Sequence, residues 1–226
     1  MSKPEQTSPQ PRRGWPDKRQ AISQASRLVF GRDGYTRASI EAIAAEAGVS
    51  TRTIYNHFED KEHLFLTVIE ESASEVANAQ IALIHRYLDK VTDIEADLIA
   101  FGCVWATSSG DFADHFALVR QINAEVGHIP QATLERWQET GPRRVHRELA
   151  RRMEHLADKG LLRTVDAEQS AMHFVLLAAT EVTNRSYYGA VPIDPDEVTR
   201  IATAGVRAFL DGYLPSPTAD AAPSGE

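Results

Sequence analysis

The chain has 226 residues, of which 42% are apolar and 25% are charged, and its formal net charge is −8. This length suits one large or two small globular domains, and the acidic balance argues against a protein that coats nucleic acid without specificity. No apolar run approaches the roughly 20 residues that cross a bilayer, so we expect no membrane partner. The single cysteine, Cys103, excludes a disulfide within the chain and fits a reducing, cytoplasmic location.

Charge is distributed unevenly along the chain. Residues 1–65 hold ten Lys and Arg against eight Asp and Glu, a net charge of +2, and the remainder has a net charge of −10. An N-terminal segment that is less acidic than the rest is suited to contact DNA through a local surface, although the contrast is modest.

Both ends are predicted to be irregular. Residues 1–16 are rich in proline and small polar residues, so we expect a disordered arm without the apolar core of a secretory signal. Residues 214–226 are predicted to form a frayed tail. The segment between them shows helical periodicity throughout, so the predicted fold class is all-α.

The first predicted helix begins at Asp17. Its spacing to Gln20 is that of a capping box, and Gly31 and Gly34 mark the expected end of the helix.

The next two helices are joined by a tight turn. The second begins near Ser39, Gly48 permits the turn, and Ser50 is a strong N-cap for a short third helix that ends near His57. The predicted small core of this region consists of apolar residues at helical spacing: Ile40, Ile43, Ala44, Val49, Ile54 and Phe58.

The third helix has little to bury. Ile54 lies within it and Phe58 just beyond it, and most other positions are polar. A second helix that is polar on its outer face is what a helix-turn-helix needs to enter a major groove. A solvated surface helix would show the same pattern, so the pattern alone leaves both interpretations open.

Residues 35–64, YTRASIEAIAAEAGVSTRTIYNHFEDKEHL, closely resemble the DNA-binding region of the TetR (tetracycline-repressor-like) family. The resemblance implies a three-helix helix-turn-helix domain over residues 17–62 and a larger helical domain for dimerisation and ligand binding over residues 63–213. It also implies a homodimeric repressor that a small apolar or amphipathic ligand releases from a palindromic operator. Arg12 and Arg13 could reach the adjacent minor groove.

The resemblance further implies which side chains contact DNA. Arg52 would pair with the acceptors of guanine, and Tyr55 and His57 would contact phosphates. Lys61, at the start of the fourth helix, would neutralise another phosphate. The candidate DNA-binding residues are Ser39, Ser50, Thr51, Arg52, Thr53, Tyr55, Asn56, His57 and Lys61.

The fourth helix is predicted to run from Asp60 past Val76 and to connect the two domains. A Gly141-Pro142 pair should kink or split one of the later helices, because proline removes a hydrogen bond of the helix. The later helices are expected over residues 93–108, 111–126, 130–159, 166–189 and 194–213.

The last two helices have broad apolar faces. The resemblance implies that they form a four-helix bundle with their symmetry mates, and ordinary core within one chain is the alternative. The candidate dimer residues are Ala171, Val175, Ala178, Val182, Val198, Ile201, Ala202, Gly205 and Phe209.

A ligand pocket among the middle helices would be mostly apolar, with a few polar groups. Its candidate lining is Phe101, Trp105, Phe116, Trp137, Met172, His173 and Phe174. The same residues would also suit a plain hydrophobic core, in which His173 would be a hydrogen-bonded core histidine.

No catalytic constellation is visible in the sequence. It contains no Gly-rich phosphate loop, nucleophile elbow or HExxH motif, so we expect no enzyme activity, no metal and no cofactor. The alternative function is a dimeric DNA-binding protein that responds to no ligand. An enclosed cavity of several hundred Å³ would distinguish the two.

Overall fold

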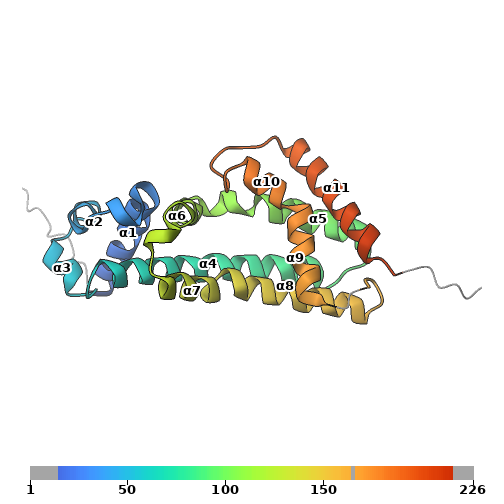
Figure 1. Cartoon of the computed structure of the whole chain (residues 1–226), viewed down its shortest axis with the longest axis horizontal. Helices are drawn as coiled ribbons and strands as arrows, with labels where there is room; N and C mark the ends of the chain where they lie inside the picture. Colours follow the sequence, from blue (N-terminus) through green and yellow to red (C-terminus); the bar gives the residue numbers. More distant parts are fainter. Residues whose placement is uncertain (1–14, 164–165, 216–226) are drawn as a thin grey trace, which may run out of the picture.

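The computed structural model describes residues 15–163 and 166–215, and every regular element in these ranges is a helix (Figure 1). The first 14 and last 11 residues, which include most of the predicted arm with Arg12 and Arg13 and most of the predicted tail, lie outside the described residues. No helix in the described ranges is long and apolar enough to cross a bilayer. The N-terminal helices are α1 (Trp15–Arg37), α2 (Ile40–Ala47), α3 (Thr51–Tyr55) and α4 (Lys61–Leu88).

Helix α1 is longer at both ends than its sequence suggested. It begins at Trp15, so Asp17 lies inside the helix rather than at its N-cap. Gly31 is helical, and a Cβ there would lie 3.2 Å from Ala117 Cβ, so this glycine permits a close helix contact instead of ending α1. Only Gly34 leaves helical geometry, with φ 81° and ψ 170°, and the helix resumes until Arg37 beyond this kink.

The turns around α2 and α3 agree with the sequence. Ser39 caps α2 by accepting a hydrogen bond from the amide of Ala42, and Ser50 caps α3 by accepting one from the amide of Thr53. Gly48 adopts the left-handed conformation, with φ 65°, which lets the two helices turn within three residues. Local chemistry therefore sets the position of α3.

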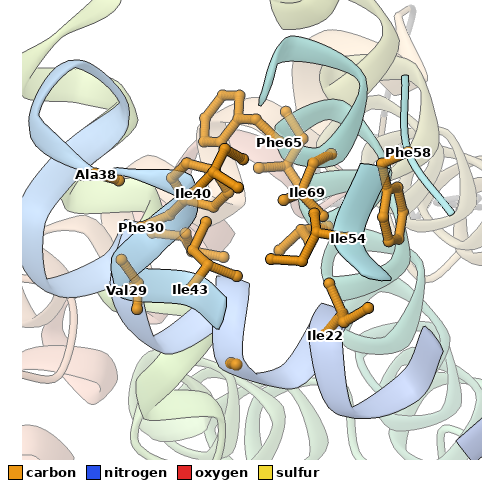
Figure 2. Packing of buried hydrophobic residues seen from close by; sticks show 14 of the residues in the cluster. Ile22, Val29, Phe30, Ala38, Ile40, Ile43, Ile54, Phe58, Phe65 and Ile69 are labelled. Carbon is orange, nitrogen blue, oxygen red and sulfur yellow. The ribbon is translucent and has the colours of Figure 1, made fainter. Parts of the chain in front are cut away.

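A continuous hydrophobic cluster holds the N-terminal helices together (Figure 2). Five of the six predicted core residues are buried, and Val49 packs against them half-buried. Ile54 is the buried residue of α3, so this one side chain anchors the helix. The cluster extends through Phe65 and Ile69 of α4 to residues of two later helices, α6 (Ala113–Ala124) and α7 (Gln131–Thr140).

Helix α4 runs along the length of the molecule and carries the chain from the N-terminal helices to the rest (Figure 1). The predicted boundary between residues 62 and 63 falls in its first turn. The other helices of the second part are α5 (Ile94–Thr107), α8 (Pro142–Asp158), α9 (Ala167–Ala178), α10 (Thr180–Arg185) and α11 (Pro195–Tyr213), with short 3-10 turns at Ser108–Phe112 and Val126–His128.

Two helix breaks shape this second part. The predicted split at Gly141-Pro142 separates α7 from α8, and Pro142 takes the first position of α8, where no amide is needed. The single helix expected over residues 166–189 is instead broken at Ala179 and ends at Arg185. A second hydrophobic cluster joins α4, α5, α8, α9 and α11.

Candidate DNA-reading surface and ligand pocket

Helix α3 presents its polar side chains outward. Arg52, Tyr55 and Asn56 are exposed, and Tyr55 keeps 55% of its surface accessible although it is aromatic. The other candidates on or beside α3 are half-buried (Thr51, Thr53, His57) or exposed (Ser50). The Thr53 hydroxyl lies 2.9 Å from the Ser50 hydroxyl, so the cap orders the side chains at the start of the helix.

Burial lowers the pKa of two candidates, His57 and Lys61. Desolvation, together with nearby Arg19 and Lys18, lowers the pKa of His57, so its imidazole is suited to donate a hydrogen bond rather than to act as a cation. Desolvation also lowers the pKa of Lys61. The Lys61 ammonium donates to the carbonyl of Thr36 at 3.2 Å and lies 4.9 Å from the centre of the Tyr35 ring.

Glu125 connects α6 to the kinked end of α1. Its carboxylate accepts hydrogen bonds from the amide of Thr36 at 2.9 Å and from the Thr36 hydroxyl at 3.3 Å. A side chain at Gly34 would collide with this carboxylate. Because Lys61 holds the carbonyl of the same Thr36, these contacts tie α6, α1 and the start of α4 together. We call the Glu125–Thr36–Lys61 contacts the latch.

A pocket of about 520 Å³ lies among the helices of the second part. Four of the seven predicted ligand residues line it: Trp105, Phe116, Trp137 and Met172. Phe101 and Phe174 instead stack in the core of the protomer, with ring centroids 5.4 Å apart. His173 does not line the pocket. Its Nδ1 lies 2.6 Å from the Tyr213 hydroxyl, so it is hydrogen-bonded as the alternative predicts, but it is half-buried and not a core residue.

The pocket wall contains a buried polar pair that the sequence did not reveal. His115 Nδ1 lies 2.9 Å from the hydroxyl of Ser72, which is fully buried on α4. Burial lowers the pKa of His115 to about 4, helped by the charge of Arg27, so the imidazole is neutral at physiological pH. It can therefore exchange hydrogen bonds with a neutral or anionic group in the pocket.

Tyr188 is a further lining residue that sequence reasoning missed. It follows α10 in a turn where Tyr187 and Tyr188 have φ of 49° and 54°, a conformation that non-glycine residues rarely adopt. Arg120 of α6 donates to the carbonyls of both residues, at 3.4 and 3.3 Å. The neighbouring Gly189 indicates that a helix ends nearby, but no local sequence pattern predicts that Tyr188 lies beside α6.

The candidate dimer residues mostly lie inside the protomer. Seven of the nine are buried by the chain's own side chains: Ala171, Ala178, Val182, Val198, Ile201, Ala202 and Phe209. Gly205 sits where α11 crosses α9 so closely that a Cβ would overlap the Leu177 carbonyl. The small residues therefore allow close packing within one chain, and only Val175 and Gly205 keep partial surface for a partner.

Within the described residues, no group of three or more His, Cys, Asp or Glu side chains is placed to hold a metal ion. A short, outwardly polar helix behind a tight turn, joined by one long helix to a bundle with a pocket, defines the class of helix-turn-helix transcriptional regulators.

Comparison with known proteins agrees with this class. The family described as "Bacterial regulatory proteins, tetR family" matches residues 22–68, and the family "AefR-like transcriptional repressor, C-terminal domain" matches residues 112–215. The chain belongs to the TetR family of bacterial regulatory proteins, which are transcriptional regulators and not enzymes.

Individual relatives are similar over different lengths. The transcriptional repressor AcnR of Corynebacterium diphtheriae is 37% identical over 60 residues, which is 26% of this chain and only 32% of AcnR. A TetR-family regulator from Mesorhizobium loti is 29% identical with a TM-score of 0.78, covering 89% of this chain and 98% of that chain. The flavonoid-responsive regulator FrrA is 26% identical with a TM-score of 0.65, covering 88% and 98%.

Proposed function

We propose that the protein is a homodimeric repressor that reads a palindromic operator with α3 and is released from it by a small apolar or amphipathic ligand. In this proposal, residues 17–62 form the DNA-reading head and residues 63–213 form the sensing and dimerisation domain. Such a protein acts where the chromosome is, in the cytoplasm. The observation that carries the proposal is the outward polar face of α3, fixed by Ser50 at its start and by Ile54 beneath it.

Reading of the major groove is proposed for the exposed residues of α3. Arg52 offers the two donors that match guanine, and exposed Tyr55 and Asn56, together with half-buried Thr51, are proposed to contact phosphates or base edges. His57 would donate a hydrogen bond to a phosphate as a neutral imidazole. Ser39 and Lys61 flank the same surface at the starts of α2 and α4, where free amides favour anions.

Ligand response is proposed because α6 lines the pocket and also contacts the DNA-reading head. His115, Phe116, Val119 and Asn123 of this helix line the pocket, and Glu125, two residues after Asn123, holds Thr36. A ligand that prefers a displaced α6 would shift the population towards a head orientation that no longer fits the operator. The pocket supports a ligand response, although it opens to the surface and is not the enclosed cavity that would distinguish the two functions. The relative FrrA is itself described as flavonoid-responsive.

Dimerisation is proposed through the outward faces of α9 and α11. On α9, Leu176 and Leu177 are exposed and do not line the pocket, and on α11 the exposed small residues Ala204 and Ala208 lie one helical turn apart. A contiguous exposed apolar patch would be typical of an interaction surface. Two heads related by a two-fold axis could then read two half-sites.

The direct test is selection of DNA by the purified protein from a random or genomic library, followed by sequencing. We expect an enriched inverted repeat whose half-site centres are separated by about 10 base pairs or a multiple of one helical turn. The absence of any enriched sequence would refute the proposed function, and an enriched single site would refute its dimeric form.

A further inference from the structure

Aromatic side chains from four parts of the fold meet in the pocket. They are Trp105 of α5, Phe116 of α6, Trp137 of α7 and Tyr188 after α10. Phe116 and Tyr188 stack with their ring centroids 6.5 Å apart. Three of these residues are only half-buried, so their rings keep free surface for a ligand. Flat aromatic faces on several walls favour a ligand that is itself aromatic.

The polar groups that face the pocket are neutral or basic. They are Gln80, His115, Asn123, Gln138, Arg143 and His146, and within the described part of the chain no Asp or Glu lines the pocket. A cationic ligand would lose its hydration there without a carboxylate in the lining, since Glu168, 2.9 Å from the Nε2 of the lining His146, does not itself line the pocket. The lining is therefore suited to a neutral or negatively charged ligand.

Arg143 supplies an excess of positive charge at the first turn of α8. Its guanidinium donates to Glu139 Oε1 at 2.8 Å, but the other oxygen of Glu139 accepts from Arg147 at 3.0 Å. One carboxylate thus serves two guanidinium groups. The next residue, Arg144, donates to the uncharged amide oxygen of Asn78 at 2.6 Å. The N-terminal end of α8 adds the partial positive charge of its free amides.

We propose that the pocket takes aromatic acids: ligands whose ring system lies among the four aromatic side chains and whose carboxylate or phenolate is directed at Arg143. This inference rests on the proposed function, because it specifies the ligand class of the same pocket. Neutral His115, across the pocket on α6, would hydrogen-bond a second polar substituent on the ring.

Two dyes with the same ring system test the proposal. 8-Anilinonaphthalene-1-sulfonate carries a negative charge, and N-phenyl-1-naphthylamine does not. Each is titrated by fluorescence into the full chain, and each is tested for displacement of the other. We expect both dyes to bind one site per chain and to compete. Tyr188→Ala should weaken both, because it removes one aromatic wall outside any helix.

The decisive variant is Arg143→Gln. It should weaken the sulfonate dye about tenfold, which is what loss of a hydrogen bond to a charged group produces, and leave the uncharged dye within about twofold. The matched control is Arg151→Gln on the same helix, because Arg151 does not line the pocket and 70% of its side chain is exposed. This control should leave both affinities unchanged.

Three results would overturn the inference. If Arg143→Gln leaves the sulfonate affinity unchanged, the pocket does not recognise the acid through Arg143. If the variant weakens both dyes equally, Arg143 has only a structural role. In either case the pocket, and with it the proposed ligand response, survives. If neither dye binds the wild-type chain, the ligand pocket itself fails and the inference falls with it.

Discussion

At the scale of single residues, burial decides which groups carry charge. Desolvation by burial lowers the pKa of His115 to about 4, the charge of Arg27 on α1 acts in the same direction, and the charge of Glu75 on α4 acts in the opposite direction. The head shows the same effect, since burial lowers the pKa of both His57 and Lys61. Exposed Arg52 and the Lys61 ammonium therefore supply positive charge for DNA, whereas His57 is suited to a neutral contact.

The neutrality of His115 predicts sensitivity to acid. Its pKa is about 4 in the folded chain and about 6.5 when unfolded, so only the unfolded chain binds the proton in between. The free energy of unfolding is therefore highest above pH 6.5 and decreases as the pH falls towards 4. The decrease is about 2 kcal/mol by pH 5. Urea unfolding at pH 7 and pH 5 measures it.

The variant His115→Gln should lose much less stability between these two pH values than the wild type. The exposed His155 provides the control, because His155→Gln should keep the wild-type sensitivity. Equal losses in His115→Gln and the wild type would show that His115 is not the group responsible.

Two residues of the head should affect DNA binding in different ways. Arg52→Ala should cost about 1–3 kcal/mol and relax the preference at one base position, as expected for a base contact. Lys61→Ala should weaken binding to all sequences and reduce the salt slope by about 1, as expected for a phosphate contact. Fluorescence anisotropy with the selected operator, its single-base variants and a range of salt concentrations distinguishes these outcomes. An unchanged salt slope in Lys61→Ala would show that Lys61 does not contact a phosphate and serves only to hold the Thr36 carbonyl.

Among the helices, α6 both lines the pocket and contacts the DNA-reading head. It packs on α1 (Figure 1), with Gly31 at the contact. It also contributes one wall of the pocket, and Glu125, which follows it, accepts a hydrogen bond from the amide of Thr36. A displacement of α6 is therefore expected to disturb the end of α1. The head and the pocket are coupled through contacts, in addition to the covalent connection along α4.

Removal of the latch should loosen the end of α1. In Glu125→Ala the Thr36 amide loses its acceptor, so its hydrogen exchange should accelerate about tenfold, while the amides in the middle of α4 stay protected. Hydrogen-exchange mass spectrometry resolves this segment. Glu135→Ala on α7 is the control, because Glu135 is exposed and pairs with Gln131 of its own helix. Unchanged hydrogen exchange at Thr36 in Glu125→Ala would show that the latch does not hold the end of α1.

The features that could be predicted from the sequence are the local ones. The caps at Ser39 and Ser50, the left-handed Gly48 and the break before Pro142 depend on neighbours within a few residues, and the structure confirms all four. The predicted end of α1 at Gly31 is wrong, because contact with α6 keeps Gly31 helical.

Features that depend on distant parts of the chain could not be predicted. An apolar stripe shows that a helix face is buried but not which neighbour covers it, so core residues such as Ala178 and Phe174 were assigned to the dimer or the ligand. Glu125 and Thr36 are 89 positions apart, and neither stands out in its own segment. The pocket charge likewise depends on how Arg143 and Arg147 share Glu139.

At the scale of the whole molecule, the proposal requires two copies. The exposed side chain of Leu176, which is 51% accessible, lies on the outward face of α9. Leu176→Glu should convert the dimer to a monomer, because it would bury a carboxylate in an apolar interface. Size-exclusion chromatography with light scattering measures this change.

Val126→Glu is the matched control for that variant. Val126 is equally apolar and 56% exposed, but it lies in the 3-10 turn after α6, far along the chain from α9. It should leave the dimer intact. A wild-type chain that is already monomeric, or a Leu176→Glu variant that stays dimeric, would contradict the proposed interface.

The central claim is that two copies of α3 read DNA together, and a hydroxyl-radical footprint on the selected operator tests it most directly. We expect two protected patches on one face of the duplex, with centres one helical turn or a multiple of it apart, and their loss in Arg52→Ala at concentrations where the wild type protects. A single protected patch, or the same footprint in Arg52→Ala, would contradict it.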